Sequence, residues 1–139
     1  MPKFRWAMLC ERAIVDSRSN NMSLMGVVEQ FNVPDLPTTI PQIFDLAMLW
    51  EKDDSLKGKD EAFSFKIVIT QKKREVSINK GKTYEINIPK NKYRLRSISS
   101  IRGIPVKEEK TLYFRIYVKS KDKWEKIFSI PIEIKKVTA

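Results

Sequence analysis

The chain of 139 residues contains no histidine. Histidine is the commonest general base in enzymes and the partner of Ser-His and Cys-His nucleophiles. It is also a frequent zinc ligand. Its absence excludes those catalytic arrangements and every histidine-containing zinc site.

Cysteine and glycine are scarce as well. The one cysteine, Cys10, excludes an internal disulfide, cysteine-rich zinc sites and iron–sulfur clusters, and its apolar surroundings predict a buried, inert thiol. The four glycines, at 26, 58, 81 and 103, are too far apart for a phosphate-binding glycine loop. No spacing of carboxylates identifies an acid/base pair. We therefore expect a protein that is not an enzyme and has no cofactor, and no residue pattern indicates a small-molecule ligand.

Long apolar runs are also missing. No stretch approaches the roughly 18 apolar residues that cross a bilayer. The N-terminal segment becomes charged again at Glu11 and Arg12, which makes its apolar part too short for a signal peptide. We expect a cytoplasmic protein without membrane contact, and the length fits a single domain over residues 1–139.

Charge is abundant but unevenly distributed. The net charge is +10, yet residues 1–61 contain seven Lys or Arg against ten Asp or Glu, whereas residues 62–139 contain twenty against seven. The basic second half is compatible with nucleic-acid binding, and it equally suits the protection of strand edges by lysine.

Residues 111–136 show the clearest pattern. Apolar and polar residues alternate from Leu112 to Lys119 and again from Phe128 to Lys135, which predicts two strands of an antiparallel sheet. Matching their apolar faces pairs Val118 with Trp124, so a loop of three or five residues is expected, with Asp122 in the left-handed conformation. Lys126 is then expected opposite Ile116.

The remaining chain also favours strands. A hairpin is expected from strands over 4–15 and 22–33, followed by a proline-rich crossover at 34–41. Residues 42–51 are read as a strand in preference to a helix. Further strands start at Phe63, Tyr84 and Tyr93. The strand from Phe63 is expected to continue to Val76 and Ile78, before a turn over 79–82. The predicted fold is an all-β antiparallel sandwich of about eight strands, immunoglobulin-like or C2-like, with a β-barrel as the alternative.

Several short motifs point to a family. Cys10-Glu11-Arg12-Ala13, the segment from Ser23 to Val27, the prolines at 37 and 41, and the tryptophans at 50 and 124 with Pro131 carry the likeness. The chain resembles a family of small prokaryotic β-sandwich proteins classified only as a domain of unknown function. The resemblance covers nearly the whole chain and implies a compact sandwich, with no established active site.

Three groups of residues are candidates for a site. The acidic loop over 52–61 offers carboxylates to a cation such as calcium, although its lysines oppose binding and a solvated loop is favoured, so no metal site is assigned. The tryptophans at 6, 50 and 124 are expected in the core. Aromatic and cationic residues on the later strands can bind a nucleic acid or a protein if their faces coincide. These candidate binding residues are Arg94, Arg96, Tyr113, Arg115 and Tyr117.

Two functions follow from these observations. The first is a non-enzymatic binding or scaffold module that contacts a partner protein or its own copies through exposed strand edges. The alternative is a nucleic-acid-binding module that uses a basic and aromatic sheet face.

Overall fold

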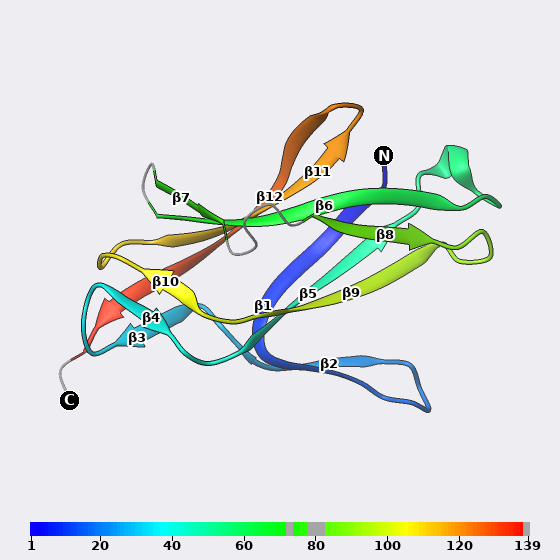
Figure 1. The fold of residues 1–139 in the computed structure, drawn as a ribbon. Helices are drawn as coiled ribbons and strands as arrows, with labels where there is room; N and C mark the ends of the chain where they lie inside the picture. The colour runs from blue at the N-terminus through cyan, green and yellow to red at the C-terminus, as the bar shows by residue number, and fades with distance from the viewer. Residues whose placement is uncertain (72–73, 78–82, 138–139) are drawn as a thin grey trace.

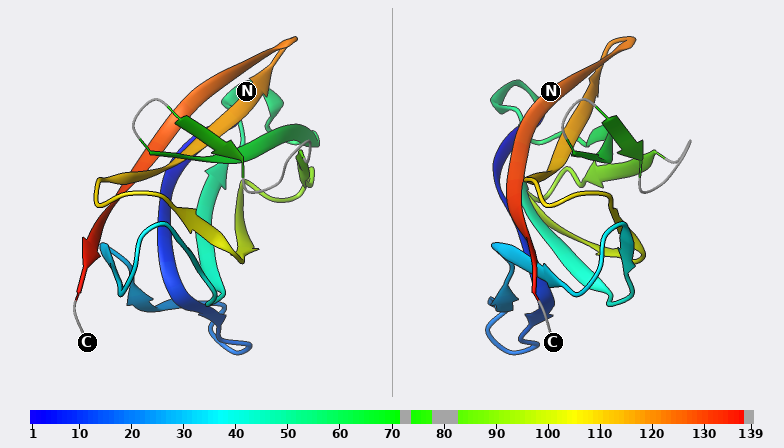
Figure 2. Two further views of the ribbon diagram at one scale, coloured as in Figure 1. Left: turned by 60° about the vertical axis from the view of Figure 1, so that its left-hand side comes forward. Right: turned by 90° about the vertical axis from the view of Figure 1, so that its left-hand side faces the viewer.

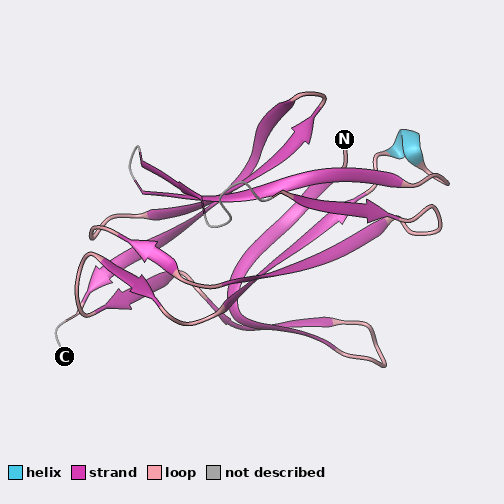
Figure 3. Cartoon of the chain, in the orientation of Figure 1, coloured by secondary structure: helices cyan, strands magenta, loops and turns pink. Residues whose placement is uncertain are grey.

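The computed structural model describes residues 1–71, 74–77 and 83–137, and these form strands apart from turns and one short 3-10 segment (Figure 3). The described elements, in chain order, are β1 (Lys3–Val15), β2 (Met22–Val27), β3 (Gln30–Val33), β4 (Thr38–Ile40), β5 (Phe44–Glu51), η1 (Asp54–Leu56), β6 (Glu61–Gln71), β7 (Arg74–Ser77), β8 (Tyr84–Ile88), β9 (Arg94–Ile101), β10 (Ile104–Val106), β11 (Leu112–Ser120) and β12 (Lys123–Lys136). The protein is all-β, as the alternation of its residues predicts. Within the described ranges, no helix is long and apolar enough to cross a membrane.

The strands are arranged in three sheets (Figure 1). One sheet has the order β2-β1-β5-β9, and the largest has the order β3-β12-β11-β6-β7 with β8 also paired to β6. A small sheet joins β4 to β10. The pairing of β3 with β12 is parallel, and the other pairs are antiparallel. The β1–β2 and β11–β12 hairpins project from opposite ends of the molecule (Figure 2).

The core is formed by the inward faces of the two larger sheets. On β5, the side chains of Phe44, Leu46, Met48 and Trp50 are buried, which confirms the strand predicted for this segment. Trp50 is 0% exposed, and its ring contacts Phe4 from the four-stranded sheet and Phe63 and Phe65 from the largest sheet. Its indole nitrogen donates to the hydroxyl of Ser97 at 3.0 Å. Trp50 therefore ties the two larger sheets together.

The predicted core positions of the other tryptophans are not observed. Trp6 and Trp124 are half-buried, and Trp124 lies on the outer face of β12 against Lys66. The burial of Cys10 is confirmed, since its thiol is fully enclosed.

The terminal hairpin differs from its predicted register. Ser120 pairs with Lys123, so the turn is formed by Lys121 and Asp122 alone, and Lys121 (φ 57°) takes the left-handed conformation in place of Asp122. Phe114 pairs with Ile130, and a β-bulge at Ile127 restores the match of apolar faces. The extra residue shifts the pairing by one position, so that apolar residues of both strands again lie on the same face beyond the bulge. A two-residue turn is therefore compatible with one buried face. Lys126 consequently pairs with Tyr117 and is exposed.

The predicted strand over 22–33 is two strands in different sheets. The N–H of Val28 donates to the carbonyl of Leu9 on β1, whereas the carbonyl of Glu29 accepts from the N–H of Glu133 on β12. The chain therefore passes from one sheet to the next between these two residues. Gly26, just before the crossing, has φ +64°, and a Cβ there would lie 2.7 Å from the Glu11 side chain.

Two further predictions are corrected. The crossover at 34–41 contains a short strand, β4, and the strand from Phe63 ends at Gln71 because β7 pairs back on β6 in the antiparallel sense. These two short strands, the unpredicted short strand β10 and the division at 28–29 give twelve strands in the described residues where about eight were expected. Ile78 and the predicted turn at 79–82 lie outside the described residues.

Replacement of the central tryptophan tests the role of Trp50. Trp50→Ala is expected to destabilise the protein by about 3–5 kcal/mol, because it removes a fully buried ring from between the sheets. The half-exposed Trp124→Ala is the matched control and is expected to cost about 1 kcal/mol. Urea unfolding measures both, and similar losses in the two variants would contradict this description of the core.

Candidate functional site

The predicted arginines on β9 are part of the scaffold of the four-stranded sheet. The guanidinium Nε of Arg94 lies 3.0 Å from Oε1 of the buried Glu51, and Arg5 donates to the other oxygen of that carboxylate at 2.7 Å. Arg96 donates to the side chain of Asn20, in the β1–β2 turn, at 2.7 Å. Glu51 therefore links β1, β5 and β9 through two arginines.

Tyr113, Arg115 and Tyr117 lie on β11 in the largest sheet, away from β9. Their side chains alternate with buried apolar residues and are half-buried on the outer face. The guanidinium of Arg115 lies 5.4 Å from the centre of the Tyr113 ring, and the Lys66 ammonium lies over Tyr117 and Trp124. The structure thus gathers three of the five predicted residues, together with Lys66 and Trp124, and places Arg94 and Arg96 in another sheet.

The carboxylates of the acidic loop serve separate local contacts. Asp53 accepts from the backbone and hydroxyl of Ser55, Asp54 accepts from Lys3 and Tyr93, and Asp60 accepts from the backbone N–H of Lys90. The Lys3 hydrogen bond lowers the pKa of Asp54, and the Ser55 backbone lowers that of Asp53. In the described part of the chain, no group of three or more carboxylate or cysteine side chains is placed to hold a metal ion.

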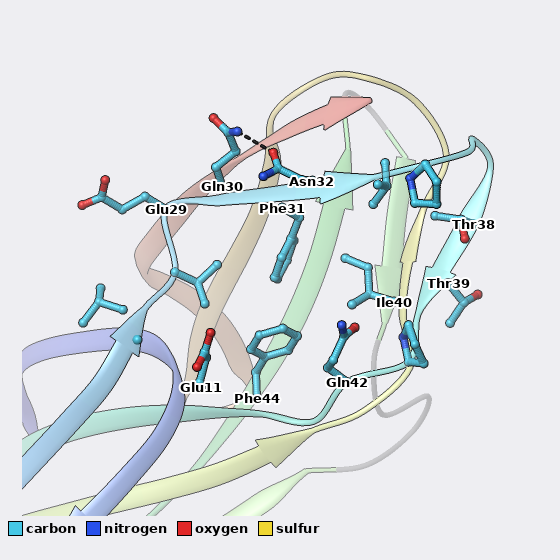
Figure 4. A pocket seen from close by; sticks show the side chains of 16 residues that line it. Glu11, Glu29, Gln30, Phe31, Asn32, Thr38, Thr39, Ile40, Gln42 and Phe44 are labelled. Atoms are coloured by element: carbon cyan, nitrogen blue, oxygen red, sulfur yellow. Dashed lines mark hydrogen bonds between the residues drawn. The ribbon is translucent and has the colours of Figure 1, made fainter. Parts of the chain in front are cut away.

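A separate hollow lies where β3 faces β4 and the start of β5 (Figure 4). We call it the β3 groove, and its volume is about 800 Å³. Its floor is formed by Phe31 and Phe44, whose ring centres are 5.1 Å apart, with Ile40 and Val33 beside them. The rest of its lining comes from Glu11, the segment from 26 to 30, Asn32, Pro34, the β4 threonines, Pro41 and Gln42.

The backbone of β3 leaves one edge open along this groove. The carbonyls of Glu29 and Val33 accept from Glu133 and Val137, so they face β12. Because successive peptide groups of a strand point to alternate sides, the N–H and C=O of Gln30 and Asn32 face away from β12. No strand among the described residues pairs with this edge. The side chains of these two residues hydrogen-bond to each other at 2.6 Å above the groove.

The groove differs in charge from the rest of the protein. Its charged lining residues are Glu11 and Glu29, with no lysine or arginine among them, although the whole chain carries +10. Glu11 packs its side chain against Gly26 and reaches into the groove from β1, whereas Glu29 lies just before β3 with its carboxylate directed away from the Phe31 and Phe44 rings. The site therefore combines an acidic rim, an apolar floor and an open strand edge.

Residue patterns alone did not identify this groove. The five predicted binding residues share aromatic or cationic character, whereas the groove depends on the crossing at 28–29 and on the parallel pairing of β3 with β12. One signal was available, namely the acidic balance of residues 1–61 in a basic chain.

The fold and these surfaces define an all-β protein with an open strand edge beside a groove. The chain belongs to the family of unknown function DUF6941, whose model matches residues 5–133. Comparisons with curated proteins and with solved structures found no match.

The Glu51 cluster makes stability depend on pH. The hydrogen bond from Arg5 lowers the pKa of Glu51 below its ordinary value of 4.5, against the opposing effect of burial, and the charges of Arg5 and Arg94 lower it further. A carboxylate with a lowered pKa stabilises the fold above its ordinary value and loses that contribution as the pH falls through its folded value.

Glu51→Gln is therefore expected to lower the melting temperature at neutral pH, with a deficit that shrinks below pH 4.5 as the wild-type carboxylate protonates. Thermal melts between about pH 3 and pH 7 measure this deficit. The exposed Glu85→Gln serves as control. A deficit that stays constant over the whole range would contradict the assigned pKa direction.

Proposed function

We propose that this protein is a non-enzymatic binding module whose β3 groove holds an extended, lysine- or arginine-containing segment of a partner protein. The observation that carries the proposal is the open edge of β3 beside a groove with an acidic rim. An extended peptide can add a strand to such an edge, so that main-chain hydrogen bonds supply affinity.

The main-chain part of the interaction would use Gln30 and Asn32. The backbone N–H and C=O groups of these two residues point away from β12. They offer two hydrogen-bond donors and two acceptors to an incoming strand. The partner's alternate side chains would then point toward the floor formed by Phe31 and Phe44. An apolar residue there gains contact with the two rings, and those rings are already held in the core.

The charge of the partner follows from the rim. Glu11 and Glu29 attract a basic segment into the groove, whereas the positive charge over the rest of the protein repels such a segment from other surfaces. Complementary charge contributes mainly to specificity and to the rate of association. We infer in addition that the two larger sheets form a sandwich of the immunoglobulin-like or C2-like type, which the contacts of Trp50 across them support.

A peptide array tests the proposal. Seven-residue peptides that alternate apolar residues with lysine or arginine are expected to bind, and the same peptides with glutamate in place of the basic residues are not. The double variant Glu11→Gln/Glu29→Gln is expected to weaken binding at least tenfold, as the loss of two charge contacts of about 1 kcal/mol each implies. Glu85→Gln/Glu125→Gln, which removes two exposed carboxylates outside the groove, is the matched control.

The strand edge has a separate test. Asn32→Pro removes an N–H that faces away from β12, so we expect the fold to persist and peptide binding to be lost. Peptides methylated at alternate backbone nitrogens should fail in the same way. The proposal is wrong if no basic peptide binds, or if binding survives both Asn32→Pro and the rim variants. A dimer in light scattering that Asn32→Pro converts to a monomer would identify a second copy of this chain as the occupant instead.

A single-stranded nucleic acid is the second candidate ligand, favoured by the outer face of β6, β11 and β12. Tyr113, Arg115, Tyr117, Lys66 and Trp124 alternate cations with rings there, and the Nε of Arg115 is buried without a hydrogen-bond partner in the described residues. These cations already cover the rings, so bases would have to displace them in order to stack. The β3 groove requires no such rearrangement and is the preferred site.

Fluorescence titration with a labelled oligo-dT separates the two candidates. If the β3 groove is the functional site, Arg115→Ala and Tyr117→Ala are expected to leave any oligonucleotide binding unchanged. Binding that collapses as salt rises and falls at least tenfold in these variants would support the nucleic-acid function in its place.

A further inference from the structure

A second pocket lies at the far end of β5 from the β3 groove. It is bounded by the loop after β5, which contains η1, and by the turn between β8 and β9, and its volume is about 490 Å³. The lining residues are Lys52, Asp54, Lys57, Gly58, Lys90, Asn91, Lys92 and Tyr93. We call it the lysine pocket. β5 has eight residues, which separates the two sites by roughly 25 Å of extended strand.

The two loops that form the lysine pocket are fastened to each other. The backbone N–H of Lys52 donates to the carbonyl of Tyr93 at 2.8 Å, and the hydroxyl of Tyr93 donates to Asp54 at 3.2 Å. The carboxylate of Asp60 accepts from the N–H of Lys90 at 2.6 Å. The walls are therefore positioned before any ligand binds, which reduces the entropy lost on binding.

The charge of the lining is strongly positive. Four lysines line the pocket, and the carboxylate of the single aspartate, Asp54, is already engaged by Lys3 at 2.9 Å. Lys57, Lys90 and Lys92 are exposed around the opening, and none of them forms an ion pair within the described residues. Their ammonium groups are free to converge on an anion.

Lys52 distinguishes this pocket from an ordinary basic surface. Its side chain is 1% exposed, and its ammonium donates to the carbonyl of Pro89 at 2.6 Å. An ammonium has three N–H donors, and a buried charge is costly unless an opposite charge lies nearby. Among the described residues no carboxylate forms an ion pair with it. A buried positive charge beside three exposed ones favours a multiply charged anion.

We propose that the lysine pocket binds the phosphate group of a small molecule, either inorganic phosphate or a phosphate monoester. Lysines bind phosphate as point charges, and the charge of several lysines matches a phosphate dianion better than it matches a singly charged carboxylate. The volume suits a small ligand, and the ring of Tyr93 provides an apolar wall for the group that carries the phosphate. This site is independent of the β3 groove, because no residue lines both.

The test is phosphate binding by the full chain. Binding is measured as the change in melting temperature at constant ionic strength, with sodium chloride as the balancing salt. Inorganic phosphate and AMP are the probes, and both are expected to raise the melting temperature in a saturable way. Tighter binding of AMP would identify a phosphate monoester as the natural ligand class, and equal binding would identify the phosphate group itself.

The exposed pair Lys57→Gln/Lys92→Gln is the decisive variant, because Lys52→Met changes a buried residue and can fail to fold. We expect about tenfold weaker binding for each lysine removed, the factor for loss of one charged hydrogen bond. Lys121→Gln/Lys123→Gln, at the exposed turn between β11 and β12, is the matched control. Shifts that chloride reproduces, or that Lys57→Gln/Lys92→Gln leaves unchanged, would show a general ionic effect only and overturn the proposal.

Discussion

The packing of the inner face of β5 against the largest sheet is the constraint on which the rest of the structure depends. Its side chains alternate so that Phe44, Leu46, Met48 and Trp50 enter the core. Trp50 holds rings from both sheets, and Phe44 packs on Phe31 at the other end of the strand. Because β5 pairs with β1 and β9 while its inner face meets the largest sheet, both ends of the strand are fixed. Each end positions one candidate site: Phe44 forms the floor of the β3 groove, and Lys52 follows directly after Glu51.

The β3 groove results from the way in which the chain changes sheets. Val28 hydrogen-bonds to β1, and the next residue, Glu29, hydrogen-bonds to β12. β3 is therefore an edge strand of the largest sheet. A strand in that position has one paired and one unpaired side, which proteins commonly protect with lysine, proline or a covering segment. Here the open side of β3 lies beside an acidic, partly apolar groove without any lysine. That combination is the physical reason for regarding the edge as a binding surface.

Local alternation predicted the long strands, but it missed the short strands β4 and β10 and did not predict how distant strands pair. The burial of β5 and the inward face of β11 followed from the period of two, because each buries one face along its whole length. The bulge at Ile127 could not be predicted from this period, because one extra residue in a strand does not change the residue composition noticeably. Arg94 had the character of a binding residue, yet it neutralises a buried carboxylate that comes from another strand. Both candidate sites are assembled from segments far apart in the chain, and their recognition required the tertiary fold.

Amide hydrogen exchange along β3, observed by NMR in the free protein and with a bound lysine-rich peptide, tests most sharply whether the edge of β3 is open. We expect the amides of Gln30 and Asn32 to exchange rapidly in the free protein, whereas that of Phe31, which faces β12, exchanges slowly. The peptide should then slow exchange at Gln30 and Asn32 and leave Phe31 unchanged. Slow exchange at Gln30 and Asn32 before any peptide is added, or no change when it binds, would contradict an open edge that accepts a strand.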